Sequence, residues 1–185
     1  MITISTLIAV PAIAAVVLLV VPFARQAAGY LALLVSLAVL GGVIGFIYRF
    51  EPSAGYQFAD NVSWIEPLGV RWHVAVNGVS LAMIAVTALI TTCALGFALW
   101  AKRDRSHASA ALILMTEAFL ILVFAARDLF AFYVGFEGML IPLLVLLVVW
   151  GGAGRKFATL QVIAYTAFGT LLMLLGILYL GLTAP

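Results

Sequence analysis

Two glutamates lie inside long apolar runs, where acidic side chains are unexpected. The other five of the seven acidic residues lie between such runs, whereas Glu117 and Glu137 have apolar neighbours on both sides. A carboxylate in a hydrocarbon environment costs about 3 kcal/mol or more, so acids placed there usually face a protein interior and mark an ion pathway. The chemistry that these two residues predict is the exchange of protons.

The two glutamates are expected at a similar depth. A short connection around Arg127 and Asp128 separates their runs, so the two helices must be antiparallel. Glu117 precedes Arg127 by 10 residues and Glu137 follows Asp128 by 9, which at ~1.5 Å per residue places both about 14 Å from the connection. If the carboxyl groups faced each other, their repulsion would let the pair hold one proton and exchange it, as a proton relay requires. The sequence leaves open whether they face each other.

Gly135, Gly138 and Pro142 surround Glu137. Pro142 has no amide hydrogen to donate to the carbonyl of Gly138, and a free carbonyl inside a helix bundle can bind water. Alternatively, the glycines let two helices pack closely while the acid hydrogen-bonds a neighbour. We favour a functional role for Glu137 and leave both interpretations open for Glu117.

The last apolar run also carries polar side chains, namely Gln161, Tyr165, Thr166 and Thr170. These groups can line a hydrated path. Hydroxyl and amide groups commonly hydrogen-bond between helices, however, and this is the interpretation that we favour.

The composition indicates what kind of protein holds these residues. Of 185 residues, 66% are hydrophobic and 9% are charged, whereas soluble domains are about 25% charged. The net charge is +2 and the cations form no extended basic patch, which argues against nucleic-acid binding. We therefore predict an all-α integral membrane protein, with residues 1–185 forming a single transmembrane domain.

Six apolar runs are long enough to cross a membrane, since a helix needs about 20 such residues. They cover about 4–23, 29–48, 79–100, 108–126, 129–150 and 159–182. A cleaved signal peptide carries positive charge before its apolar core, whereas the first cation here is Arg25, after the first run. The sequence thus predicts six spans, of which the first is retained.

The distribution of Lys and Arg predicts the orientation. Cytoplasmic loops carry an excess of these residues. Six of the nine Lys and Arg residues follow spans one, three and five, namely Arg25, Lys102, Arg103, Arg105, Arg155 and Lys156. The other three lie on the opposite side of the membrane, namely Arg49, Arg71 and Arg127. The side with six is expected to be cytoplasmic, which places both termini on the outer side, for a bacterium outside the inner membrane.

The long loop 49–78 between spans two and three is expected to form a short outer β-hairpin. Apolar and polar residues alternate from Val70 to Asn77, as in a strand with one buried face. Pro67-Leu68-Gly69 is a turn signal. His73 falls on the polar side of this strand, so we interpret it as a solvated residue.

A longer string around Glu137 resembles a known family. The string reads Ala126-Arg127-Asp128-Leu129-Phe130-Ala131-Phe132-Tyr133-Val134-Gly135-Phe136-Glu137-Gly138-Met139-Leu140-Ile141-Pro142. It resembles the fifth-helix signature of the M-type antiporter-like subunit of respiratory complex I, the proton-translocating NADH:quinone oxidoreductase. Further similar segments are Asn77-Gly78-Val79-Ser80-Leu81, Trp150-Gly151-Gly152, Arg155-Lys156, Tyr165-Thr166, Gly169 and Leu171-Leu172-Met173-Leu174-Leu175. The resemblance covers about residues 60 to 182.

The resemblance implies a specific function. Family members take part in proton translocation coupled to electron transfer from NADH to quinone, and they bind no redox cofactor themselves. NADH, FMN, iron–sulfur clusters and quinone are then expected on partner subunits. The counterpart of Glu137 pairs with a lysine on a broken seventh helix, and Glu117 matches an acid on helix four. The chain would be a non-redox subunit of a translocase without a self-contained active site.

The chain also departs from the family pattern. Family members have a 14-helix fold with two inverted five-helix repeats, and the seventh-helix lysine and the second repeat are missing from this sequence. Gln161 stands where a lysine is usual, and Asn77 where an aspartate is usual. A partner chain is therefore expected to supply the remaining helices, the chain being a split subunit, a truncated product or a specialised paralogue. The alternatives are a subunit of a sodium/proton antiporter or membrane-bound hydrogenase complex, or a purely structural relative.

Overall fold

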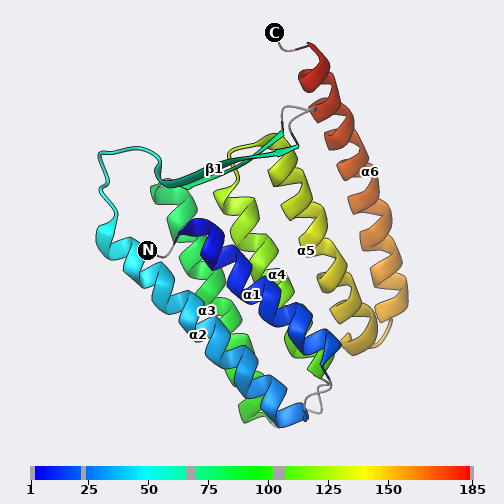
Figure 1. Cartoon of the computed structure of the whole chain (residues 1–185). Helices are drawn as coiled ribbons and strands as arrows, with labels where there is room; N and C mark the ends of the chain where they lie inside the picture. The colour runs from blue at the N-terminus through cyan, green and yellow to red at the C-terminus, as the bar shows by residue number, and fades with distance from the viewer. Residues whose placement is uncertain (1–2, 22–23, 66–69, 102–106, 184–185) are drawn as a thin grey trace.

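The computed structural model describes residues 3–21, 24–65, 70–101 and 107–183. These residues form six helices and one two-stranded sheet (Figure 1). In chain order they are α1 (Ile4–Val20), α2 (Arg25–Arg49), β1 (Gln57–Ile65), β2 (Val70–Val76), α3 (Gly78–Trp100), α4 (His107–Ala125), α5 (Leu129–Trp150) and α6 (Arg155–Thr183).

Within the described part of the chain, five helices, α2 to α6, are long and apolar enough to cross a membrane. The predicted class, a mostly helical integral membrane protein, is therefore confirmed. α1 is apolar but has 17 residues, and the last two residues of the first predicted run, 22–23, lie outside the described ranges. So do three of the cations that predicted the orientation, Lys102, Arg103 and Arg105.

Polar side chains determine where three of the helices begin. The side chain of Thr3 caps α1, and that of Asp128 caps α5. At α3, Asn77 Oδ1 accepts from the amide of Ser80 at 2.8 Å, and Ser80 Oγ accepts from the amide of Asn77 at the same distance. Such caps satisfy amides that have no partner within the helix. The amide oxygen of Asn77 supplies the acceptor that this cap requires.

The cap at Asp128 leads to a testable prediction. Asp128 Oδ1 accepts from the amides of Phe130 at 2.9 Å and Ala131 at 3.1 Å. Asp128→Ala should destabilise the first turn of α5 by about 1 kcal/mol. We expect amide hydrogen exchange at the start of α5 to become about fivefold faster in the membrane-embedded protein. Asp128→Asn keeps an acceptor and should exchange like the parent, and equal exchange in the alanine variant would contradict this role.

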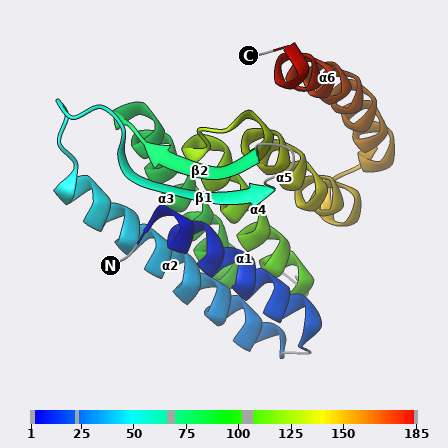
Figure 2. The same ribbon diagram turned by 45° about the horizontal axis from the view of Figure 1, so that its top comes forward.

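α4 is the central helix of the bundle. It packs against α1, α2, α3 and α5 and also touches β2. α6 packs mainly against α5 and stands apart from the other helices, as Figure 2 shows from the hairpin end. The start of α1 and the end of α6 both lie at the end of the bundle that carries the hairpin (Figure 1). Most of the surface of α6 is therefore free of contacts within this chain.

The bundle interior contains two apolar cores. The hairpin-side core includes Val39, Ala88 and Ile121, and the far-side core includes Ala32, Leu95 and Leu114. On α2, α3 and α4 alike, a polar residue lies between the two cores in sequence. These residues are Ser36, Thr92 and Glu117, which we call the mid-bundle polar cluster.

The antiparallel strands β1 and β2 lie across one end of the bundle. Trp72 donates its indole N–H to Ser5 Oγ at 2.9 Å, and the amide of Ser5 donates to Asp60 Oδ2 at 3.1 Å. Both strands thus hold the start of α1. The expected turn Pro67-Leu68-Gly69 lies outside the described residues.

The hairpin also holds the connection between α4 and α5. The amide of Arg127 donates to the backbone oxygen of His73 at 2.8 Å, and its guanidinium lies 3.5 Å from the centre of the Tyr56 ring. Val74, Ala75 and Val76 are all buried. The alternation of exposed and buried side chains therefore ends where β2 meets the bundle, and His73 is half-buried rather than fully solvated.

Candidate functional site

Glu117 is sealed inside the bundle. It lies near the middle of α4 and its side chain has no solvent exposure, 0%. Apolar residues flank it one turn away in both directions, Leu114 on one side and Ile121 on the other, and both are fully buried. A buried carboxyl group requires hydrogen-bond partners, because an unsatisfied polar group in an apolar interior is costly.

Ser36 supplies such a partner for one carboxyl oxygen. Its hydroxyl donates to Glu117 Oε1 at 3.0 Å and lies 2.9 Å from Oγ1 of Thr92. Ser36 is itself completely buried, whereas Thr92 is half-buried. The mid-bundle polar cluster is thus a hydrogen-bond chain that joins α3, α2 and α4 in that order.

The second carboxyl oxygen of Glu117 has a different environment. Oε2 is buried and has no hydrogen-bond partner among the described residues. The two oxygens of this carboxyl group are therefore inequivalent: Oε1 is held by a hydroxyl and Oε2 is not. Oε2 is the position at which the group can take up or release a proton without breaking an existing hydrogen bond.

Glu137 lies in a more open environment. Its side chain is half-buried on α5. Tyr133 lies one turn earlier on the same face of α5 and is half-buried as well. α5 continues through Pro142, which is buried, as one helix from Leu129 to Trp150. Glu137 is thus accessible to groups outside this chain, whereas Glu117 is not.

Two glycines determine how α5 sits on α4. A Cβ atom at Gly135 would lie 3.2 Å from the backbone nitrogen of Val123, and one at Gly138 would overlap the ring of Phe119. Gly135 therefore lies opposite Val123 and Gly138 opposite Phe119. This register places Glu137 about three residues, or ~5 Å, from the level of Glu117 along the bundle.

The two acids do not face each other across this contact. Glu117 precedes Phe119 by two residues, which is a rotation of about 200° around α4. Phe119 faces α5, whereas Glu117 points to Ser36 on α2. The structure therefore leaves the glutamates in two separate environments on opposite sides of α4.

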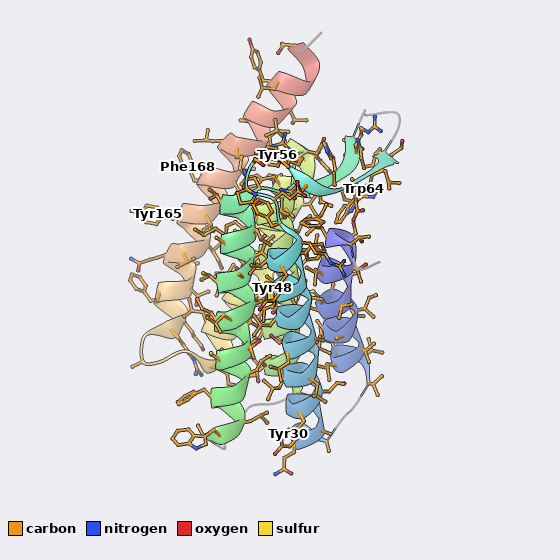
Figure 3. All side chains as sticks on the ribbon, turned by 90° about the vertical axis from the view of Figure 1, so that its left-hand side faces the viewer. Tyr30, Tyr48, Tyr56, Trp64, Tyr165 and Phe168 are labelled. Carbon is orange, nitrogen blue, oxygen red and sulfur yellow. The ribbon has the colours of Figure 1, made fainter. Side chains whose placement is uncertain are left out.

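The polar residues of α6 also divide into two groups. Gln161 and Tyr165 are exposed, and Figure 3 shows Tyr165 and Phe168 pointing away from the bundle. Thr166 and Thr170 are at least partly buried, and their hydroxyls donate to backbone oxygens of α6 itself, at 2.7 Å to Val162 and 3.3 Å to Ala167. Among the described residues, the two threonine hydroxyls thus donate within α6 rather than to another helix.

Ser36 and Thr92 are site residues that sequence analysis missed. Hydroxyl residues are common in membrane helices and usually bond to their own backbone, so neither residue is conspicuous in the sequence. The available signal was their position, since each lies in the middle of a span as Glu117 does. Only the pairing of α2, α3 and α4 shows that these residues are neighbours.

The fold is an apolar helix bundle with one glutamate buried at its centre and another half-buried on α5. These features define the class of protein as a helical membrane protein with ionisable groups inside its spans. A family model described as "NADH:quinone oxidoreductase/Mrp antiporter, TM" matches residues 126–183. The chain is 32% identical to NAD(P)H-quinone oxidoreductase chain 4 3 of a Picosynechococcus species, over 98% of this chain and 33% of that protein. It is 38% identical to F(420)H(2) dehydrogenase subunit M of Methanosarcina mazei, over 97% of this chain and 36% of that protein.

A solved structure has the same fold. A chain in respiratory complex I from Thermus thermophilus with bound NADH superposes with a TM-score of 0.79 and 28% identity, covering 95% of this chain and 35% of that one. The chain therefore belongs to the antiporter-like membrane subunits of the NADH:quinone oxidoreductase family and corresponds to the N-terminal portion of subunit M, or chain 4. It spans about a third of the length of these relatives.

Proposed function

We propose that this chain is part of a membrane subunit of an NADH:quinone oxidoreductase, in which it takes part in proton translocation coupled to electron transfer from NADH to quinone. The observation that carries this proposal is the likeness to a chain of respiratory complex I over 95% of the present chain. The two intramembrane glutamates support it, since acids at this depth are functional groups by default.

In this proposal the two glutamates have different tasks. Glu137, half-buried at the surface of α5, exchanges a proton with a basic group on a helix outside this chain. Glu117 holds a proton inside the bundle. The two acids lie on opposite sides of α4, which supports two separate proton-exchange steps rather than one proton shared between them. The redox chemistry, with NADH, FMN, iron–sulfur clusters and quinone, belongs to partner subunits, and this chain contributes no active site of its own.

The proposed topology has six spans, with α1 as the first. The 17 residues of α1 extend about 26 Å, close to the ~30 Å of a hydrocarbon core. Both termini would face the outer side of a bacterial inner membrane. This orientation is supported by the exposed Arg155 and Lys156 at the start of α6, because that end of α6 lies at the opposite end of the bundle from the hairpin (Figure 1), as expected for cytoplasmic cations.

In the assembly, α6 is proposed to be covered by helices that correspond to the rest of the relatives' length. Tyr165 is 84% exposed and Phe168 is 69% exposed in this chain alone. Exposed apolar side chains suit lipid as well as protein, but Gln161 on the same helix suits a protein neighbour better, because an amide in lipid lacks hydrogen-bond partners.

A second candidate keeps the membrane role and changes the complex. The matching family description also names the Mrp antiporter, and one relative is a subunit of an F(420)H(2) dehydrogenase. The chain could accordingly serve a cation/proton antiporter or a membrane complex with another electron donor, such as a hydrogenase.

Copurification tests these proposals. The tagged chain would be extracted from its own membranes in a mild detergent, and the accompanying proteins would be identified by mass spectrometry. We expect subunits of an NADH dehydrogenase arm together with the helices that cover α6. Antiporter or hydrogenase subunits would instead support the second candidate. Recovery of the chain alone would contradict both and leave a purely structural relative.

A further inference from the structure

We propose that Ser36 and Thr92 are positioning residues that hold Glu117 Oε1 in place, so that Glu117 exchanges its proton at Oε2 alone. This inference rests on the proposed function, because it concerns how Glu117 takes part in proton transfer. It adds two hydroxyl residues on two further helices, α2 and α3, to the proton-handling machinery.

The direction of the hydrogen bonds follows from the number of protons available. A hydroxyl group has a single proton to donate. Ser36 donates that proton to Glu117 Oε1 at 3.0 Å, so its contact with Thr92 at 2.9 Å requires Thr92 to be the donor. The chain therefore runs from Thr92 through Ser36 to the carboxyl group.

This direction is compatible with both protonation states of Glu117. When the carboxylate is ionised, Oε1 accepts from Ser36. When a proton binds at Oε2, the oxygen Oε1 becomes the carbonyl oxygen and still accepts from Ser36. Protonation at Oε1 would instead make Ser36 accept from the carboxyl group, which reverses that hydrogen bond and leaves the Ser36 proton without its acceptor. The hydroxyl chain therefore favours Oε2 as the single exchange position, and Oε2 is the oxygen without a partner among the described residues.

Thr92 differs from its neighbours on α3 in the use of its hydroxyl. Thr87 and Thr91 donate to backbone oxygens one turn earlier on α3, each at 2.9 Å. In the described part of the chain, the hydroxyl of Thr92 bonds to Ser36 and to no backbone oxygen. Its proton is therefore available to Ser36, as the proposed direction requires.

The location of the cluster also supports a positioning role. Apolar cores lie on both sides of it along the bundle, so the carboxyl group has few other polar groups with which to pair. Hydrogen bonds in such surroundings are strong, and loss of one partner leaves the other unsatisfied. One change in the chain should therefore alter the carboxyl group itself.

Infrared difference spectroscopy of the intact complex tests this inference. The carbonyl band of protonated Glu117 would be assigned as the band lost in Glu117→Gln. Because a hydrogen bond to a carbonyl oxygen lowers its stretching frequency, Ser36→Ala should move the band to higher frequency, and Thr92→Val should move it less in the same direction. Ser36→Thr retains the hydroxyl and should restore the band. The double variant should match Ser36→Ala, since Thr92 acts through Ser36.

Proton translocation driven by NADH in membrane vesicles supplies the functional measurement. Ser36→Ala should lower its rate about tenfold, which corresponds to one hydrogen bond to a charged group, and Ser36→Thr should recover it. Thr91→Val is the matched control, since it removes a buried hydroxyl that donates to the backbone oxygen of Thr87 on its own helix.

Failure of the positioning role can be distinguished from failure of the proposed function. An unchanged band in both Ser36→Ala and Thr92→Val, or an additive shift in the double variant, would overturn the positioning role while leaving the proposed function intact. Unchanged proton translocation in Glu117→Gln would overturn the functional role of Glu117 whatever the spectra show. If Ser36→Ala does not assemble, Thr92→Val still tests the chain, because valine replaces a half-buried threonine of nearly the same shape.

Discussion

Glu137→Gln is expected to lower NADH-driven proton translocation to about a hundredth or less of the parent rate, the size of a lost proton-transfer step. Glutamine has nearly the same shape as glutamate but cannot release and rebind a proton at neutral pH. The half-buried position of Glu137 on α5 leaves its carboxyl group able to reach a basic group on another helix. Fluorescence quenching of a pH-sensitive dye in inverted membrane vesicles would measure the rate.

Two controls make this prediction specific. Glu51→Gln removes an exposed acid before the hairpin and should leave translocation unchanged. Oxidation of NADH by an artificial acceptor, which bypasses the membrane arm, should also be unchanged in Glu137→Gln. Parent-like translocation in an assembled Glu137→Gln complex would contradict the proposed role of this residue and favour a structural one.

Gly138→Val should have the largest effect on assembly. A Cβ atom at this position would lie 2.7 Å from Cζ of Phe119 and closer still to other atoms of the ring. α5 would have to move away from α4, or the Phe119 ring would have to leave its place opposite Gly138. Overpacking of this kind costs about 1–3 kcal/mol, and we expect much less assembled complex on native gels of solubilised membranes.

A compensating change tests the cause of this effect. Gly138→Ala adds the smallest side chain and should lower the amount of assembled complex. A second substitution, Phe119→Leu, removes part of the ring and should partly restore that amount. Gly45→Val on α2 is the matched control, since a Cβ atom there has no neighbour within 4 Å. Normal assembly of Gly138→Val would be evidence against the close contact between α4 and α5.

Much of the candidate site could be predicted from the sequence. Glu117 and Glu137 were recognisable because an acid inside an apolar run is a local property, visible without any knowledge of packing. The string from Ala126 to Pro142 pointed to the family, and the matched region that begins at residue 126 agrees with it. The sequence could not show which partners the two acids have, because the rotation of each helix depends on its neighbours.

The sequence by itself determined the class of this protein, the approximate extent of its helices and the presence of two acids inside them, because hydrophobicity is read along the chain. The similar depth that helical rise predicted for the acids differs from the structure, in which the register of α5 on α4 offsets them by ~5 Å. The tertiary structure alone decided that Glu117 bonds to Ser36 and that Ser36 contacts Thr92. It also decided that Glu117 points away from α5, the helix that carries Glu137, so that the two acids lie on opposite sides of α4. The physical reason is close packing: Gly135 and Gly138 let α5 approach one face of α4, and this approach leaves Glu117 facing α2.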